Sequence, residues 1–132
     1  MAVACLALAA CTSTTPTAVT EARDLEQADA LPLTAFYDAP PLTATEPGAL
    51  LRQESGTGYD LPEGVSAVRI LYHSLDAAGR DVATSGVVLI PAGTAPKKGW
   101  PVIAWAHGTS GVARMCAPSA MKDVYYGDEG RF

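Results

Sequence analysis

Apolar and polar residues alternate along this chain most regularly between residues 68 and 90. Residues 68–73 alternate with the two-residue period of a β-strand. A run of turn-forming residues follows at 76–81, and residues 82–90 return as a second strand. The pattern therefore predicts a β-hairpin, preceded by a short strand over residues 50–54.

A second apolar run, over residues 102–106, does not alternate. The indole N–H of Trp105 is its one polar side-chain group, which is typical of a strand buried on both faces of a parallel sheet. Two glycines follow within five residues, so the backbone can turn sharply and present its N–H groups outward. Beyond them, the pattern predicts a short helix over residues 120–126, capped by Ser119. Antiparallel strands that lead into a parallel strand are the expected architecture.

The first 35 residues have the pattern of a targeting segment and a tether. Residues 1–10 are apolar and small, and they run into Leu-Ala-Ala-Cys, which resembles a bacterial lipobox ending at Cys11. Lipidation of Cys11 would anchor the protein to a membrane of the bacterial cell envelope. Residues 11–35 are predicted to be a disordered polar tether, with one weak helical stretch at 21–30. The folded domain is predicted to occupy residues 36–132.

The signal segment departs from the usual pattern because no Lys or Arg precedes Arg23. A missing basic region suggests a start codon placed too late or a missing 5′ end. A cleaved secretory signal with a chance cysteine is the alternative to a lipoprotein. Either reading predicts an exported protein, and Cys5 would leave with the signal.

Charge and composition exclude some classes of protein. The chain has 132 residues, enough for one small domain, and a formal net charge of −5. No basic cluster exceeds the pair Lys97 and Lys98, so a nucleic-acid partner is not expected. His73, His107 and Cys116 lack the spacing of metal ligands, so neither a metal nor another cofactor is expected.

The loop after residue 106 carries the candidate chemistry. A buried strand that ends in a glycine-flanked turn of free N–H groups is how an α/β-hydrolase builds half of its oxyanion hole. The Thr109 N–H is the predicted donor, Gly108 supplies the turn, and His107 holds the loop in shape by hydrogen bonding. Ser110 is disfavoured as a nucleophile, because Val112 stands where Gly-x-Ser-x-Gly requires its second glycine.

Two other side chains have less specific interpretations. His73 alternates with apolar residues and is expected to be a surface or core histidine. Cys116 would be left unpaired in an oxidising compartment, so its partner is expected beyond Phe132. A buried free thiol at Cys116 is the alternative.

A set of short motifs, in order, resembles the N-terminal part of the secretory lipase family, the fungal lipase-A type of α/β-hydrolase. The resemblance covers residues 46–120. Its motifs are Pro-Gly-Ala-Leu-Leu-Arg at 47–52, Val-Arg-Ile-Leu-Tyr-His-Ser-Leu-Asp at 68–76, Ser-Gly-Val-Val-Leu-Ile-Pro at 85–91, Trp-Ala-His-Gly-Thr at 105–109 and Cys-Ala-Pro-Ser at 116–119. It implies an α/β fold and serine-mediated hydrolysis of acyl esters, with a catalytic triad further along than this chain reaches.

Two classes of function follow. The first is the N-terminal part of an exported lipase or carboxylesterase, acting on triacylglycerol or short-chain esters, whose partners are the ester substrate and the membrane reached through Cys11. This chain by itself is then expected to be inactive. The second is a lipid-anchored, non-catalytic binding or structural module that is complete as given.

Overall fold

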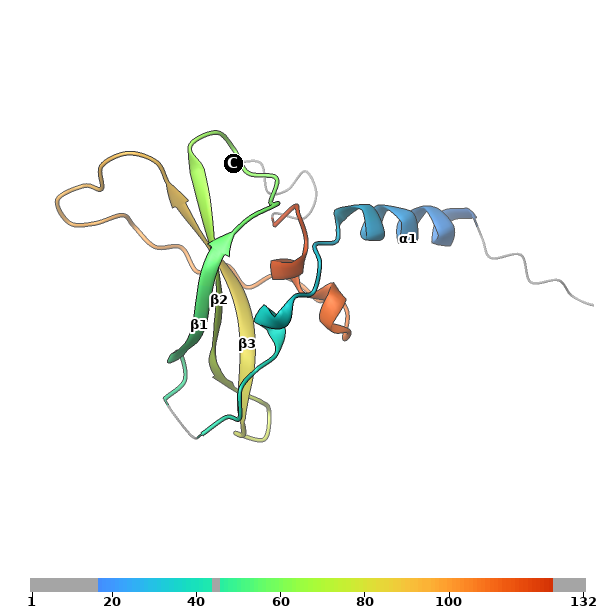
Figure 1. The fold of residues 1–132 in the computed structure, drawn as a ribbon, viewed down its shortest axis with the longest axis horizontal. Coiled ribbons are helices and arrows are strands. Elements are labelled where there is room, and N and C mark those ends of the chain that lie inside the picture. The colour runs from blue at the N-terminus through green and yellow to red at the C-terminus, as the bar shows by residue number, and fades with distance from the viewer. Residues whose placement is uncertain (1–16, 44–45, 125–132) are drawn as a thin grey trace, which may run out of the picture.

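The computed structural model describes residues 17–43 and 46–124, and Figure 1 shows their arrangement. Three strands form the sheet, and one helix extends away from it. The elements are α1 (Thr17–Asp29), β1 (Leu50–Gly56), β2 (Val65–Leu75) and β3 (Asp81–Pro91), with short 3₁₀ helices at Ala35–Tyr37, Arg114–Cys116 and Pro118–Ala120.

The sheet is antiparallel throughout, in the order β1-β2-β3. β2 and β3 pair without a register shift from Val65 opposite Pro91 to Leu75 opposite Asp81. Their connection is closed by the Asp76 carboxylate, which accepts the backbone N–H groups of Ala78 and Arg80 at 2.9 Å each. The hairpin and the preceding strand predicted from the alternation are confirmed, each extending a few residues beyond the predicted bounds.

The core lies on one face of this sheet. Alternate residues of β2 are buried there, and Leu71 packs with Phe36, Tyr37 and Ala120. Segments from both ends of the described chain, residues 30–43 and the two C-terminal 3₁₀ helices, cover this face (Figure 1). The core is therefore built from parts of the chain that are more than 80 residues apart in sequence.

The two ends of the described chain are joined by backbone hydrogen bonds. Ala30 bridges to Met121, the Leu31 N–H donates to the Ala120 carbonyl at 2.8 Å, and the Lys122 N–H donates to the Asp29 carbonyl at 2.8 Å. We call these contacts the terminal clasp. Helix α1, which ends at the clasp, buries none of its own residues. It includes most of the weak helical stretch predicted at 21–30.

The prediction of a buried strand at residues 102–106 is wrong for this structure. Residues 101–111 have no regular secondary structure, and the side chains of Val102, Ile103 and Trp105 are 92%, 86% and 80% exposed. The physical reason is a lack of neighbours. In the described part of the chain, no strand pairs with this run, and a parallel strand needs both a paired neighbour and covered faces. The observed sheet is thus antiparallel, without the expected parallel strand.

The helix predicted to begin at Ala120 is also absent where the structure can test it. Met121 has extended backbone angles because its neighbourhood pairs with Ala30 in the terminal clasp. Ser119 lies inside the 3₁₀ turn and is buried, so it does not act as a helix cap. Residues 125 and 126 lie outside the described residues. Among the helices described, none is long and apolar enough to cross a membrane.

Candidate functional site

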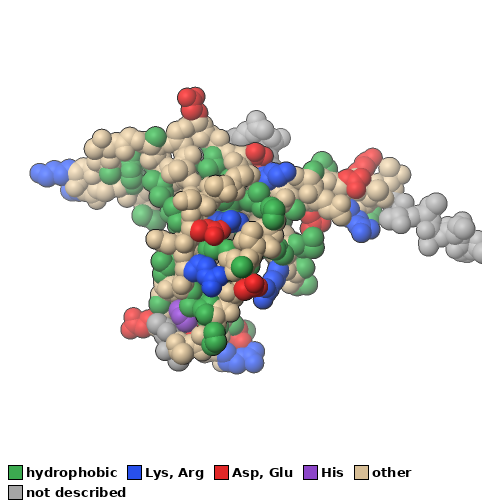
Figure 2. Space-filling model, viewed as in Figure 1, with side chains coloured by type: hydrophobic (Ala, Val, Ile, Leu, Met, Phe, Trp, Pro, Cys, Tyr) green, Lys and Arg blue, Asp and Glu red, His purple; other side chains and the backbone are tan. Residues whose placement is uncertain are grey.

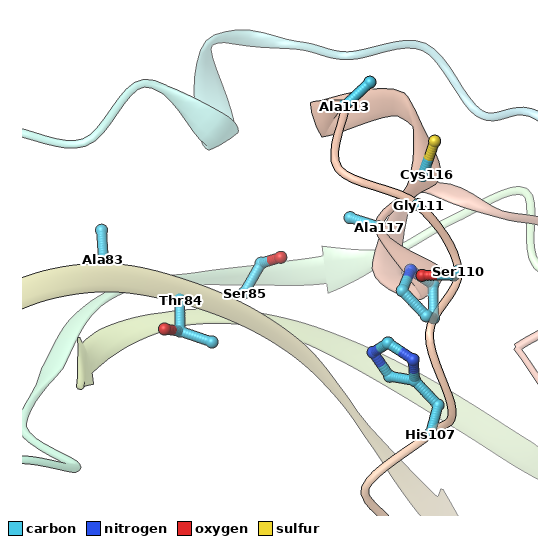
Figure 3. Close-up of a pocket in the computed structure, with 10 residues that line it drawn as sticks. Ala83, Thr84, Ser85, His107, Ser110, Gly111, Ala113, Cys116 and Ala117 are labelled. Atoms are coloured by element: carbon cyan, nitrogen blue, oxygen red, sulfur yellow. The ribbon is translucent and has the colours of Figure 1, made fainter. Parts of the chain in front are cut away.

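The predicted oxyanion loop lines an open cavity of about 310 Å³ beside β3. Residues of β3 form one side, and the loop and the C-terminal 3₁₀ segment form the other (Figure 3). Most of the lining side chains are small or carry a hydroxyl. They are Ala83, Thr84, Ser85, His107, Ser110, Gly111, Ala113, Cys116, Ala117 and Pro118.

Two backbone N–H groups of this loop form no hydrogen bond among the described residues. His107 Nδ1 lies 2.5 Å from the Gly108 carbonyl oxygen, so this ring nitrogen must carry the proton that the carbonyl accepts. Thr109 and Ser110 form no hydrogen bond with any part of the chain that the structure describes. The N–H groups of both residues therefore remain available to a ligand, and the role of His107 in shaping the loop stays a prediction.

Gly111 joins this loop to the segment that follows. Its φ of 126° lies in a region that L side chains rarely adopt, and a Cβ there would meet Cys116 Sγ at 2.6 Å. The close approach fixes the end of the loop against the 3₁₀ helix Arg114–Cys116. Cys116 is a free thiol, half-buried, 3.9 Å from a carboxylate oxygen of Glu26. A partner beyond Phe132 is not tested by this structure.

Ser119, next to the lining residue Pro118, connects the C-terminal 3₁₀ segment to the rest of the fold, a role that the sequence did not indicate. Its carbonyl accepts the hydroxyl of Tyr37 at 2.7 Å and the hydroxyl of Tyr59 at 2.6 Å. Its own hydroxyl lies 2.8 Å from Ser85 Oγ on β3. We call these four residues the Ser119 anchor. No local pattern could have identified it, because its members come from four separate segments.

A buried arginine on β2 lies against Tyr37 and the neighbouring Phe36. The Arg69 guanidinium pairs with Glu54 and lies 5.3 Å and 5.8 Å from the ring centroids of Phe36 and Tyr37. Burial raises the pKa of Tyr59 to about 12, and the neighbouring Tyr37 adds to the effect. At neutral pH, Tyr59 is therefore protonated and donates to Ser119.

The structure separates the two histidines. His73 is buried on β2, and its Nδ1 lies 2.8 and 2.9 Å from the two carboxylate oxygens of Asp81. This burial matches the core alternative expected for it, and His73 is not among the residues that line the cavity with His107, although its partner on β3, Ala83, is. Within the described residues, no three His, Cys, Asp or Glu side chains are grouped to hold a metal ion. Cys11 lies outside them.

Comparisons with protein-family models, curated proteins and solved structures found no match for this chain. The resemblance to secretory lipases therefore stays a prediction that rests on the motifs themselves.

Proposed function

We propose that this chain contributes the N-terminal part of an exported acyl-ester hydrolase of the α/β-hydrolase class, with the loop at residues 107–111 as its oxyanion loop. The observation that carries the proposal is the unused backbone N–H groups of Thr109 and Ser110. They belong to a loop whose residues His107, Ser110 and Gly111 line a cavity, with Thr109 between them in sequence. The nucleophile, acid and base of the triad belong to residues outside this chain. Lipidation at Cys11 attaches the protein to the cell envelope.

The chemistry asked of the loop is charge stabilisation. Attack on an ester carbonyl places negative charge on its oxygen, and an N–H donor about 2.7–3.1 Å from that oxygen lowers the barrier. The Thr109 N–H is the donor in this proposal. The hydrogen bond from His107 to the Gly108 carbonyl limits the movement of the Gly108–Thr109 peptide unit, which carries this N–H. The second donor is the N–H of the residue after the nucleophile.

Ser110 is not the nucleophile in this proposal. Activation of a serine needs a histidine that is itself oriented by a third group, usually a carboxylate. The histidine–carboxylate pair in the described chain is His73 with Asp81, which does not line this cavity. His107, which does line it, has Nδ1 against a carbonyl oxygen.

The test is a substitution that removes one donor from the hydrolase encoded by the complete reading frame. Thr109→Pro deletes the backbone N–H, and we expect kcat on p-nitrophenyl butyrate to fall roughly 10²–10³-fold. Thr109→Ala keeps the N–H and is the matched control, with a much smaller loss. Circular dichroism and melting temperature establish that both variants are folded, since proline also restrains Gly108.

Three outcomes contradict the proposal. One is near-normal kcat in a folded Thr109→Pro variant, which would make the loop only a connection. The others are labelling of Ser110 by a fluorophosphonate probe, and turnover by the 132-residue chain that Ser110→Ala abolishes. Each of these two results would make Ser110 the nucleophile.

A further inference from the structure

We infer that residues 97–105 form a docking segment for a membrane surface that carries anionic lipid. The segment contains both tryptophans of the chain, Trp100 and Trp105, together with the exposed Val102 and Ile103. Exposed apolar side chains in a contiguous group mark an interaction surface. In Figure 1 this part of the chain leaves the end of β3 and extends away from the sheet before returning to the 3₁₀ helices.

The distribution of charge identifies the partner. The chain as a whole is acidic, with a net charge of −5, yet no Asp or Glu occurs between Asp81 and Asp123. Lys97 and Lys98 precede the apolar run directly, and Figure 2 shows basic side chains at the tip of the same projecting loop. Lysines beside an apolar patch are attracted to an anionic headgroup layer. The acidic surface of the rest of the chain is repelled by such a layer.

The residue types fit the interface between water and lipid. Tryptophan is enriched at this depth because its ring is apolar while its N–H still finds a polar partner. The backbone of residues 101–111 is not in regular secondary structure, so its polar groups must keep contact with water or headgroups. The segment therefore docks at headgroup depth and does not span the bilayer.

The inference goes beyond the proposed function and does not depend on it. Vesicle binding involves no ester hydrolysis, so either idea can fail alone. If both hold, the docking segment runs directly into His107 and brings the cavity close to a lipid surface.

Tryptophan fluorescence tests the inference, because it reports on this segment alone. The 132-residue chain is used with Cys11→Ala, so that an acyl chain at Cys11 cannot anchor it. Vesicles of phosphatidylcholine with phosphatidylglycerol should shift the emission to shorter wavelength, and brominated lipids should quench it. Binding through the apolar residues 1–10 would not produce this quenching, since they contain no tryptophan.

Matched variants separate charge from apolar contact. Each lysine near an anionic surface is worth roughly a fivefold change in affinity, so Lys97→Gln with Lys98→Gln should weaken binding by about 25-fold. Arg23→Gln with Arg80→Gln removes the same charge elsewhere and should have a much smaller effect. Trp105→Ser should weaken binding, with Trp100 as reporter, whereas Leu25→Ser on α1 should not.

Three results would overturn the inference. The first is no quenching on anionic vesicles. The second is equal quenching on pure phosphatidylcholine with no effect of the lysine substitutions. The third is tryptophan emission that is already shifted and protected from acrylamide without lipid, because a second copy or another part of the protein then covers the segment. Light scattering identifies the second copy.

Discussion

β3 and the run at residues 102–106 are both apolar stretches, yet only the first is incorporated in the sheet. β3 follows β2 after a five-residue connection, so its pairing partner is close in sequence and the turn fixes the register. The second run has no partner strand among the described residues and leaves three large side chains exposed. Apolar composition sets a preference for burial, whereas the presence of a neighbour decides whether burial takes place.

The two regions should differ most in how much stability is lost when one side chain in each is truncated. Leu71→Ala removes a buried side chain from the cluster with Phe36 and Tyr37, and should lower the free energy of unfolding by about 2–5 kcal/mol. Ile103→Ala removes an exposed side chain and should change it by less than about 0.5 kcal/mol. Urea denaturation followed by circular dichroism measures both. Similar losses would mean that residue 103 is buried in solution and that the contrast is false.

The next largest loss of stability is expected at Gly111, where the exposed run rejoins the folded part of the chain. Gly111→Ala introduces an unfavourable φ and a contact with Cys116, and should cost about 1–3 kcal/mol. Gly99 also has positive φ, but nothing lies within 4 Å of its Cβ position and its exposed loop can adjust. Gly99→Ala should therefore change the melting temperature much less. If the two variants have the same melting temperature, the close approach of residues 111 and 116 is not maintained.

The smallest effect concerns the Ser119 anchor. Tyr59→Phe removes one hydrogen bond to Ser119 and should cost about 0.5–1.5 kcal/mol at neutral pH. The pKa of Tyr59 is raised from 10.0 to about 12 in the folded chain, so above pH 10 the unfolded chain loses this proton first. Its contribution is complete below pH 10 and is lost as pH rises towards 12.

Melting temperatures measured from pH 9 to 12 test whether the contribution of Tyr59 to stability falls as pH rises. The wild-type chain should lose more stability over that range than Tyr59→Phe, which has no hydroxyl to titrate at this position. Parallel decreases in the two proteins would show that Tyr59 ionises alike in the folded and unfolded chains.

The contrast also explains what the sequence could and could not predict. The period-2 alternation over residues 68–73 and the adjacent Asp76 turn made the hairpin predictable from local information. The alternation did not identify the buried face, because Arg69, Leu71 and His73 are buried while the opposite face is only half-buried. The run at 102–106 carries the pattern of a buried strand, but no local pattern says whether a partner exists. Loop 107–111 was singled out from its glycines and from its position after that run, and its role as an oxyanion loop stays a prediction.

Long-range polar contacts were beyond prediction for a related reason. Arg69 occupies a position in the alternation that is compatible with solvent, yet it is buried against two aromatic rings and Glu54. Ser119 looked like a helix cap because a proline precedes it, whereas two tyrosine hydroxyls from other segments meet its carbonyl. Such positions depend on which segments meet, which only the fold determines.

The terminal clasp has a consequence for the order of folding. The Leu31 N–H and the Ala120 carbonyl are 89 positions apart, so their hydrogen bond closes a very large loop, whose entropy cost must be met before the bond is made. During synthesis from the N-terminus, β1, β2 and β3 can pair while the residues that cover Phe36 and Leu71 have not yet been added. The half-covered sheet is the species most exposed to association with other chains. Arrival of Ser119 and Ala120 is the step that ends this exposure.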